Sequence, residues 1–347
     1  MGEINAVAPL VKQLQSSLPV VISSLTNTGL SAGRNRARCP VFRFADNPIL
    51  IRHVLKSCAA LVVAETELWP NALIMAGQRG VPVFLVNARV GRATERWANL
   101  KTTLRSMFAG ITAVYLKDPE QARAFSRLGV DETKLRFVGG LKFDGLSLDP
   151  DSHPKNLLVF GSVRSREFGA VVKAVSELKG VPVVIAPRHT DKLRLLFNEM
   201  KRAGLAFSTR SQGAEPSAER VLIVDTHGEL VSFYQRALVA FVGGSLVPGY
   251  GGHNILEPAA AGAVPVFGPH TENAGPEARG LVEAGGGFVV ENPGQMIKVI
   301  KTLLSDPVNR KRASEAGIGF IRVNSGASQR IAQDILQVVS KGPSALE

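Results

Sequence analysis

The amino-acid sequence predicts an α/β protein built from two doubly wound domains with a cleft between them. Short runs rich in β-branched apolar residues alternate with amphipathic stretches of helical period along the chain. These apolar runs are continuous, as expected for parallel strands covered by helices on both faces. The 347 residues are enough for two such domains. Ligands of such sheets bind outside the carboxyl ends of the strands, so the residues that follow each strand are the candidates for function.

The first half of the chain opens with a helix-like segment over 2–15 and has no strand before it. Doubly wound domains normally begin with a central strand, whose absence leaves backbone groups unpaired. The start is therefore truncated or wrongly placed, or the domain is built differently, and topology rules favour a truncated start. We expect strands at 20–25, 60–64, 81–87 and 111–115, and helices at 49–57, 71–79, 97–108 and 119–128.

The second half repeats the pattern and is expected to form the second domain. A polar stretch over 146–155, LSLDPDSHPK, contains two prolines and is typical of a linker. We therefore expect one domain over 1–148 and a second over 149–347 that includes the C-terminal helices. Strands are expected at 157–161, 181–186, 220–225, 238–243, 263–267 and 287–290, and helices at 167–178, 191–203, 229–236, 255–261, 276–283 and beyond 307.

The composition excludes several classes of protein. Two cysteines rule out a disulfide framework and a four-cysteine zinc site. The sequence contains no run of 18 apolar residues, the length that a helix needs to cross a bilayer. The net charge is +12, and the excess lies mainly in residues 1–150, with 19 basic against 11 acidic residues. A basic half suggests nucleic acid, a membrane surface or a phosphorylated substrate as partner. Aromatic residues make up only 6%, which argues against nucleic-acid binding by base stacking.

The strongest local signal is the segment 243–258, which reads GGSLVPGYGGHNILEP. It follows an expected strand and opens an expected helix, where glycines let a ligand approach the backbone and N–H groups attract a phosphate. Glu257 lies on the helix face shared with His253 and Asn254 and could accept hydrogen bonds from sugar or ribose hydroxyls. The alternative is a plain tight turn before a helix capped by Asn254.

Other strand ends of the second half carry weaker signals. Ser162 could offer a hydroxyl group to a phosphate, and Arg188 could bind a phosphate or a base carbonyl. The segment 225–230, DTHGEL, places Gly228 and Glu229 at a strand end. Its alternative is a capping box between Thr226 and Glu229, which is compatible with a ligand at the same place.

In the first half, carboxylates and arginines follow two expected strands. Glu65 and Glu67 stand beside Trp and Pro in ETELWPN, and Arg89 comes at the end of the next expected strand. Glu3 lies at a helix start, where a carboxylate is stabilised as an anion. The expected helix 97–108 is amphipathic and, with its preceding loop, basic, so it is either a core helix or a surface that meets lipid phosphates.

Taken together, these segments resemble the 3-deoxy-D-manno-octulosonic acid (Kdo) transferases of lipid A assembly. The resemblance runs from Glu3 to about residue 335. It implies the GT-B arrangement of two Rossmann-like domains and an inverting transfer of Kdo from CMP-Kdo to the tetraacylated disaccharide precursor of lipid A. The matching blocks are ETELWPN at 65–71, NAR at 87–89, GLKFD at 140–144, PRH at 187–189, DTHGEL at 225–230, GGHNILE at 251–257 and GPHT at 268–271.

The resemblance also implies roles. Glu3 matches the family's general base on the acceptor hydroxyl, and Glu65, Glu67 and Arg89 are assigned to the acceptor. No metal, no cofactor and no nucleic-acid partner are implied, and the protein is expected on the cytoplasmic face of the inner membrane as a peripheral protein. The donor-binding residues are Ser162, Arg188, Gly228, Glu229, Gly252, His253, Asn254 and Glu257.

The chain departs from the family in three places. The family's N-terminal anchor and first strand are absent, the block Thr-His-x-Gly-Glu reads VRSRE at 163–167, and the loop at 248–250 is one residue longer. Two other functions stay open. One is another GT-B glycosyltransferase or a UDP-sugar epimerase, and the other is a truncated, non-catalytic lipid-binding relative.

Overall fold

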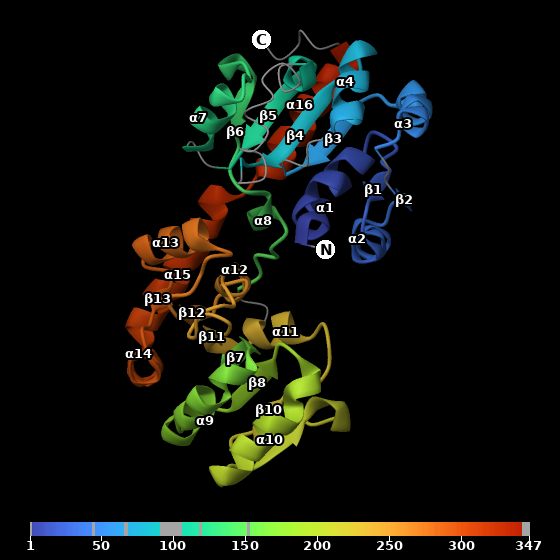
Figure 1. Cartoon of the computed structure of the whole chain (residues 1–347). Coiled ribbons are helices and arrows are strands. Elements are labelled where there is room, and N and C mark those ends of the chain that lie inside the picture. The colour runs from blue at the N-terminus through green and yellow to red at the C-terminus, as the bar shows by residue number, and fades with distance from the viewer. Residues whose placement is uncertain are drawn as a thin grey trace. The chain divides into compact units, whose positions relative to one another are not determined.

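The computed structural model describes residues 2–43, 46–65, 69–90, 106–117, 120–150 and 153–341. The chain divides into two compact units (Figure 1). Unit 1 comprises Met1–Gly145 and Asn324–Glu347, and unit 2 comprises Leu146–Val323. The sequence-based boundaries, 1–148 and 149–347, assigned the last helix to the second domain, whereas this helix packs in unit 1. An amphipathic pattern shows that a helix buries one face, but not which part of the chain covers it.

Unit 1 contains two separate parallel sheets within its described residues. One has the order β3-β4-β5-β6 and the other pairs β1 with β2. The strands are β1 (Ile22–Ser24), β2 (Val41–Arg43), β3 (Leu61–Ala64), β4 (Val83–Ala88), β5 (Ile111–Leu116) and β6 (Leu135–Phe137). The helices are α1 (Gly2–Gln15), α2 (Asn27–Ala32), α3 (Pro48–Val54), α4 (Pro70–Gln78), α7 (Glu120–Arg127), α8 (Leu141–Asp144) and α16 (Ala327–Lys341), with a π-helical turn over Gly33–Ala37.

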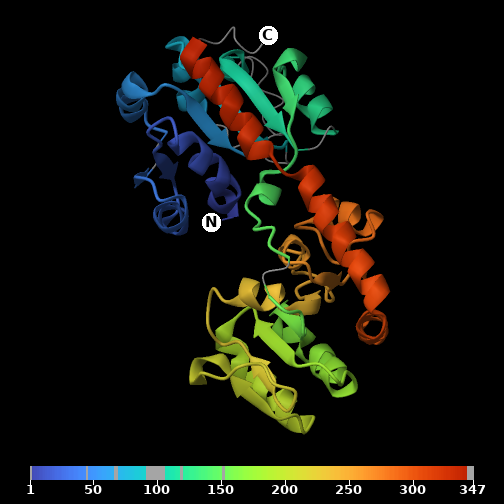
Figure 2. The ribbon, with the colours of Figure 1, turned by 180° about the vertical axis from the view of Figure 1, so that it is seen from behind.

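The two ends of the chain share one core in unit 1. Leu10 of α1 and Ile331 of α16 lie in the same buried cluster as Phe84 and Tyr115 of the four-stranded sheet. Figure 2 shows α16 running across the strands of that sheet. The Tyr115 hydroxyl donates to Asp334 of α16 at 3.1 Å. The last helix is thus part of the first hydrophobic core.

Unit 2 is built around one parallel sheet with the order β13-β12-β11-β7-β8-β10-β9. Its strands are β7 (Leu157–Val163), β8 (Val183–Pro187), β9 (Phe207–Thr209), β10 (Val221–Ile223), β11 (Ala237–Val242), β12 (Val264–Phe267) and β13 (Phe288–Val289). Its helices are α9 (Phe168–Glu177), α10 (Leu193–Arg202), α11 (Leu230–Gln235), α12 (Leu256–Ala260), α13 (Gly275–Glu283), α14 (Pro293–Ser305) and α15 (Pro307–Asn324).

The order of these strands fixes where a ligand can bind. The chain starts in the middle with β7, continues to its neighbour β8 and then to β9 at the edge, comes back to β10 between β8 and β9, and crosses to β11 on the other side of β7. The connections after β7 and β11 therefore run in opposite directions, which opens a crevice at the carboxyl ends of these two strands. Among the described helices, none is long and apolar enough to cross a membrane.

Asp144, the last residue of the GLKFD block, holds the start of the returning helix α16. Its carboxylate accepts hydrogen bonds from the N–H groups of Gly326 and Ser328, each at 2.5 Å. Helix starts leave N–H groups without a partner in the helix, and a carboxylate there also opposes the positive end of the helix dipole. The side chain thus acts as a cap supplied from a distant part of the sequence.

We predict that Asp144→Ala lowers the free energy of unfolding by about 1–2 kcal/mol, the usual cost of losing a helix cap. Urea unfolding of the purified variant, followed by circular dichroism, measures the change. Asp144→Asn keeps one acceptor oxygen and should lose less. Equal stability of Asp144→Ala and the wild type would contradict the capping role.

Candidate functional site

A fully buried carboxylate organises the crevice of unit 2. Glu167 lies in the 3-10 turn Ser165–Glu167 before α9, and its side chain has no exposed surface. It accepts hydrogen bonds from the N–H groups of Gly244 at 2.7 Å, Ser245 at 3.1 Å and Leu246 at 3.0 Å, and from Arg164 N–H at 2.9 Å. One side chain therefore joins the turn after β7 to the turn after β11.

The two turns approach so closely that glycine is required between them. A Cβ atom on Gly243 would lie 2.6 Å from Val163 Cα and 2.7 Å from the Ser162 carbonyl oxygen. Ser162 itself has φ +54°, a left-handed conformation uncommon for a serine. The turn after β12 joins them, because the hydroxyl of Ser245 accepts from the Gly268 N–H at 2.8 Å. Three strand ends are thus held together by specific hydrogen bonds.

The segment 251–257 folds back onto this turn. The N–H of Gly252 donates to the Gly244 carbonyl at 2.8 Å. Asn254 Oδ1 accepts from the Leu256 N–H at the first residue of α12, and its Nδ2 donates to Glu257, both at 3.1 Å. Asn254 therefore supports the helix start from one position before the N-cap, which is Ile255 and not Asn254 as the structural alternative predicted. Glu257, which lies beside it, is half-buried.

His253 lies within a group of cationic side chains. Arg164 Nε donates to His253 Nε2 at 3.1 Å, and Arg164 Nη1 lies 2.5 Å from His189 Nε2. Burial, together with the charges of Arg164, Arg188 and His189, lowers the pKa of His253 from 6.5 to about 4. The imidazole is therefore neutral near pH 7 and accepts the Arg164 hydrogen bond.

Aromatic contacts complete this side of the site. The guanidinium carbon of Arg164 lies 4.9 Å from the centre of the Tyr250 ring, and that of Arg166 lies 5.9 Å from it. A cavity of about 130 Å³ lies here, lined by Arg164, Tyr250, His189 and other residues of the turn after β7. Its cationic lining is suited to an anion.

Glu229 is bound differently from the capping box expected as the structural alternative. α11 begins at Leu230 without a side-chain cap. Thr226 donates its hydroxyl to the Glu229 carboxylate, and Arg210 Nε donates to it at 3.3 Å. These two partners lower the pKa of Glu229 below its ordinary value. Gly228, with φ +89°, is exposed beside it.

The eight donor-site residues predicted from the sequence all lie at the carboxyl edge of one sheet. The strands that they follow, or end, are β7, β8, β10 and β11, which are adjacent in the sheet. The sequence did not single out Arg164 or Tyr250 as residues of the site. It pointed to Glu167 only within the segment VRSRE at 163–167, which stands where the family has Thr-His-x-Gly-Glu. An acid before the apolar run FGAVV of α9 was the available signal for Glu167. The residues brought to this edge are Ser162, Arg188, Gly228, Glu229, Gly252, His253, Asn254 and Glu257.

The predicted acceptor residues belong to unit 1. Glu65 follows β3 and pairs with Arg89, which follows β4, at 3.3 Å between Oε2 and Nη2. Glu65 and Asn87 have φ of +59° and +52°, so both strand ends carry the backbone strain often stored at functional sites. Glu3 lies in the first turn of α1. Glu67 and the residues 91–105, which include most of the expected basic helix, fall outside the described residues.

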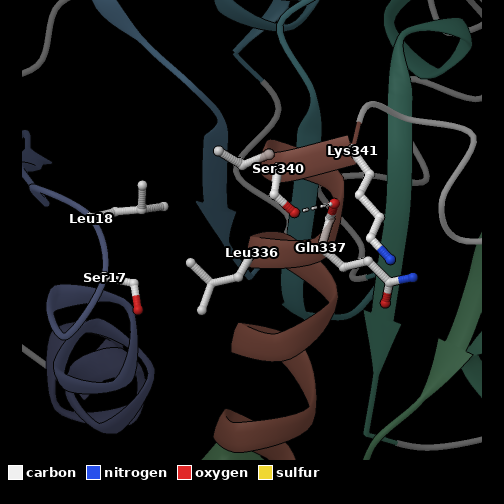
Figure 3. Close-up of a pocket in the computed structure, with 7 residues that line it drawn as sticks. Ser17, Leu18, Leu336, Gln337, Ser340 and Lys341 are labelled. Atoms are coloured by element: carbon white, nitrogen blue, oxygen red, sulfur yellow. Dashed lines mark hydrogen bonds between the residues drawn. The ribbon is translucent and has the colours of Figure 1, made fainter.

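A second cavity, of about 580 Å³, lies in unit 1 between the segment after α1 and the end of α16 (Figure 3). Leu18 and Leu336 line it together with polar side chains, and none of the predicted site residues does. Within the described ranges, no three His, Cys, Asp or Glu side chains are arranged to hold a metal ion.

Comparison with known proteins places these observations in context. The family model for 3-deoxy-D-manno-octulosonic-acid transferase matches residues 1–145. The 3-deoxy-D-manno-octulosonic acid transferase of Bordetella pertussis is 30% identical over 95% of this chain and 83% of that protein. The enzyme of the same name from Haemophilus influenzae is 29% identical over the same shares of the two chains.

Solved structures show the fold. A glycosyltransferase from Rickettsia africae has a TM-score of 0.66 at 13% identity and covers 98% of this chain and 95% of its own. UDP-GlcNAc 2-epimerase from Neisseria meningitidis has a TM-score of 0.63 at 13% identity and covers 96% and 97%. These likenesses confirm the predicted α/β fold with two Rossmann-like domains of the GT-B type.

We predict that Glu167→Gln lowers the free energy of unfolding of unit 2 by roughly 3 kcal/mol, because an amide NH₂ would face N–H donors in a buried place. Urea unfolding measures this. The exposed Glu177 of α9 provides the control variant Glu177→Gln. If both variants unfold at the same urea concentration, Glu167 does not hold the turns together.

The lowered pKa of His253 predicts a pH dependence of stability. The folded-state pKa of about 4 lies below the unfolded value of 6.5, so the unfolded state takes up the proton first. The contribution of His253 is fully present above pH 6.5 and is lost as the pH falls from 6.5 towards 4. Relative to His253→Gln, which keeps an acceptor for Arg164, the wild type should lose stability between about pH 7.5 and about pH 5.

Thermal unfolding of both proteins at the two pH values tests this dependence. His227→Gln, at an exposed histidine of the same unit, controls for the loss of any imidazole. A stability difference between the wild type and His253→Gln that does not change with pH would refute the assignment of a half-buried, neutral imidazole.

Proposed function

The chain belongs to the family of 3-deoxy-D-manno-octulosonic acid (Kdo) transferases, and we propose that it transfers Kdo from CMP-Kdo to the tetraacylated disaccharide precursor of lipid A. The observation that carries the donor assignment is the edge of the unit 2 sheet. There a glycine-rich turn, a neutral His253 and the cations Arg164 and Arg188 meet at the carboxyl ends of adjacent strands. Sugar nucleotides bind at this place in doubly wound sheets.

Within this proposal, Arg188 contacts the CMP part of the donor, and Gly228 and Glu229 line the same pocket. Glu257 accepts hydrogen bonds from ribose hydroxyls, and His253 is a neutral partner near the phosphate. Positive charge close to the departing phosphate stabilises the negative charge that develops as the glycosidic bond breaks.

The proposed reaction is a single displacement with inversion. The Glu3 carboxylate takes the proton from the acceptor hydroxyl, and the hydroxyl oxygen forms a bond to the anomeric carbon of Kdo. The bond from that carbon to the phosphate oxygen breaks, and CMP leaves with the electron pair. No redox change occurs, so the proposed reaction needs no cofactor, and the arginines supply charge stabilisation without a metal.

We place the acceptor on unit 1, with Glu65, Glu67 and Arg89 as its partners. The basic excess of residues 1–150 suits a phosphorylated lipid on an anionic membrane surface. The proposed location is therefore the cytoplasmic face of the bacterial inner membrane, where the protein binds peripherally. No nucleic-acid partner is proposed.

A transfer assay tests the function directly. The purified chain is mixed with CMP-Kdo and the lipid A precursor, and the lipid is analysed by mass spectrometry. We expect a mass gain of one or more Kdo units. Glu3→Ala should abolish transfer while CMP binding, which rests on unit 2, survives. Full transfer by Glu3→Ala would remove Glu3 from the mechanism.

Binding measurements separate the alternatives. Tighter binding of UDP than of CMP would favour another GT-B glycosyltransferase or a UDP-sugar epimerase. CMP binding without transfer to the lipid would instead indicate a different acceptor or a non-catalytic, lipid-binding relative.

A further inference from the structure

Several backbone amides of the glycine-rich turn, and that of the first residue of α12, are already used within the protein. The N–H groups of Gly244, Ser245 and Leu246 all donate to Glu167. The N–H of Gly252 donates to a carbonyl, and that of Leu256 donates to Asn254. A glycine-rich turn commonly binds a phosphate through such amides. Here these five amides are occupied, and the full positive charges that can balance a bound anion belong to side chains.

Arg164 is positioned to supply that charge. It follows the last residue of β7, and its backbone N–H is held by Glu167 at 2.9 Å. Its Nε donates to His253, its Nη1 contacts His189, and its plane lies near the Tyr250 ring. A guanidinium group has five N–H donors. Two are used in these contacts, so three remain for a ligand.

No carboxylate neutralises the arginines of this cluster. Among the described residues, no Asp or Glu oxygen lies within 4 Å of the guanidinium groups of Arg164, Arg166 or Arg188. Some other arginines of unit 2 are paired, as Arg210 is with Glu229 and Arg202 is with Glu199. A concentration of unbalanced positive charge in a crevice attracts anionic ligands.

The cavity beside Arg164 limits the size of the group that can enter. Its volume is about 130 Å³, roughly that of four water molecules. Arg164 supplies positive charge to its lining, whereas the ammonium of Lys192 pairs with Asp191 at 3.3 Å, and Ser165 and Tyr250 supply hydroxyl groups. No carboxylate lines it. The space suits one phosphate or carboxylate group rather than a whole nucleotide.

We propose that Arg164, held by His253 and Tyr250, binds an oxyanion of the sugar-nucleotide donor through the remaining N–H groups of its guanidinium fork. The donor carries two such groups, the phosphate and the sugar carboxylate, and both offer two oxygens to a bidentate arginine. The inference deepens the proposed function and rests on it. It adds a residue at a position where the family block has histidine, so this chain places a permanent charge at that position.

The test compares three variants in unit 2. Arg164→Gln removes the charge, Arg164→Lys keeps the charge without the planar fork, and Arg194→Gln removes an exposed arginine of α10 as a control. Isothermal titration measures the affinity of the whole chain for cytidine and for CMP, and transfer kinetics measure KM for CMP-Kdo. Thermal unfolding confirms that each variant is folded.

Two results support the proposal and distinguish the two groups. If Arg164 binds the phosphate, Arg164→Gln weakens CMP binding roughly 10- to 100-fold and leaves cytidine binding unchanged. If it binds the carboxylate, CMP binding stays the same and KM for CMP-Kdo rises by a similar factor. In either case Arg164→Lys should lose less than Arg164→Gln, and Arg194→Gln should lose nothing.

Unchanged CMP affinity together with unchanged KM in a folded Arg164→Gln variant would overturn the proposal. So would an equal weakening of cytidine and CMP, because that pattern indicates a distorted pocket rather than a lost anion contact. Failure of the proposed function would look different. The wild type would then prefer uridine nucleotides over CMP, and Arg164→Gln would still weaken UMP more than uridine.

Discussion

The donor crevice depends on the buried carboxylate of Glu167. Burying an ion in a protein is unfavourable unless hydrogen bonds replace its hydration. Here four backbone N–H groups do so, and they come from two turns that lie about 80 positions apart in the sequence. The turns after β7 and β11 therefore cannot move independently. The close approach at Gly243 and the left-handed backbone of Ser162 are locally unfavourable. The hydrogen bonds to Glu167 stabilise both.

This network also determines the electrostatic character of the site. Since the amides of residues 244–246 point to Glu167, they are not available to an external anion, and cationic side chains lie beside them instead. Those cations lower the proton affinity of His253. A protonated imidazole could not accept the Arg164 hydrogen bond, so the neutral state of His253 and the position of Arg164 support each other. Burial of the imidazole and the neighbouring positive charges both lower the pKa of His253.

Much of unit 2 could be predicted from the sequence because parallel strands buried on both faces leave a strong local signal. The strands β9, β2 and β6, each of three residues, were not predicted, whereas β1 and β10 are equally short but lie within the longer runs VVISSL and RVLIVD and were predicted. The pairing of Glu229 with Arg210 could not be predicted from the sequence either, because the two residues lie 19 positions apart. The local spacing favoured a capping box instead. Likewise, periodicity identifies α16 as amphipathic without showing that it covers α1. Contacts between distant segments decided each of these cases.

The motif blocks were more informative about the site than their individual residues, because contacts between distant segments decide what each residue does. Asn254, taken alone, is a helix-start residue, and its contacts bear this out. Asp144 caps α16, and Glu167 binds the glycine turn, so parts of these blocks maintain geometry rather than contact a ligand. Replacing such a residue would leave buried backbone groups without a hydrogen-bond partner. Arg164 is under a different constraint. Its guanidinium group pairs with no carboxylate among the described residues, and in our proposal an oxyanion of the donor supplies the negative charge. A side chain of this kind can change between relatives without loss of the fold, and for that reason the positions where this chain departs from the family blocks are the places to look for its own specificity.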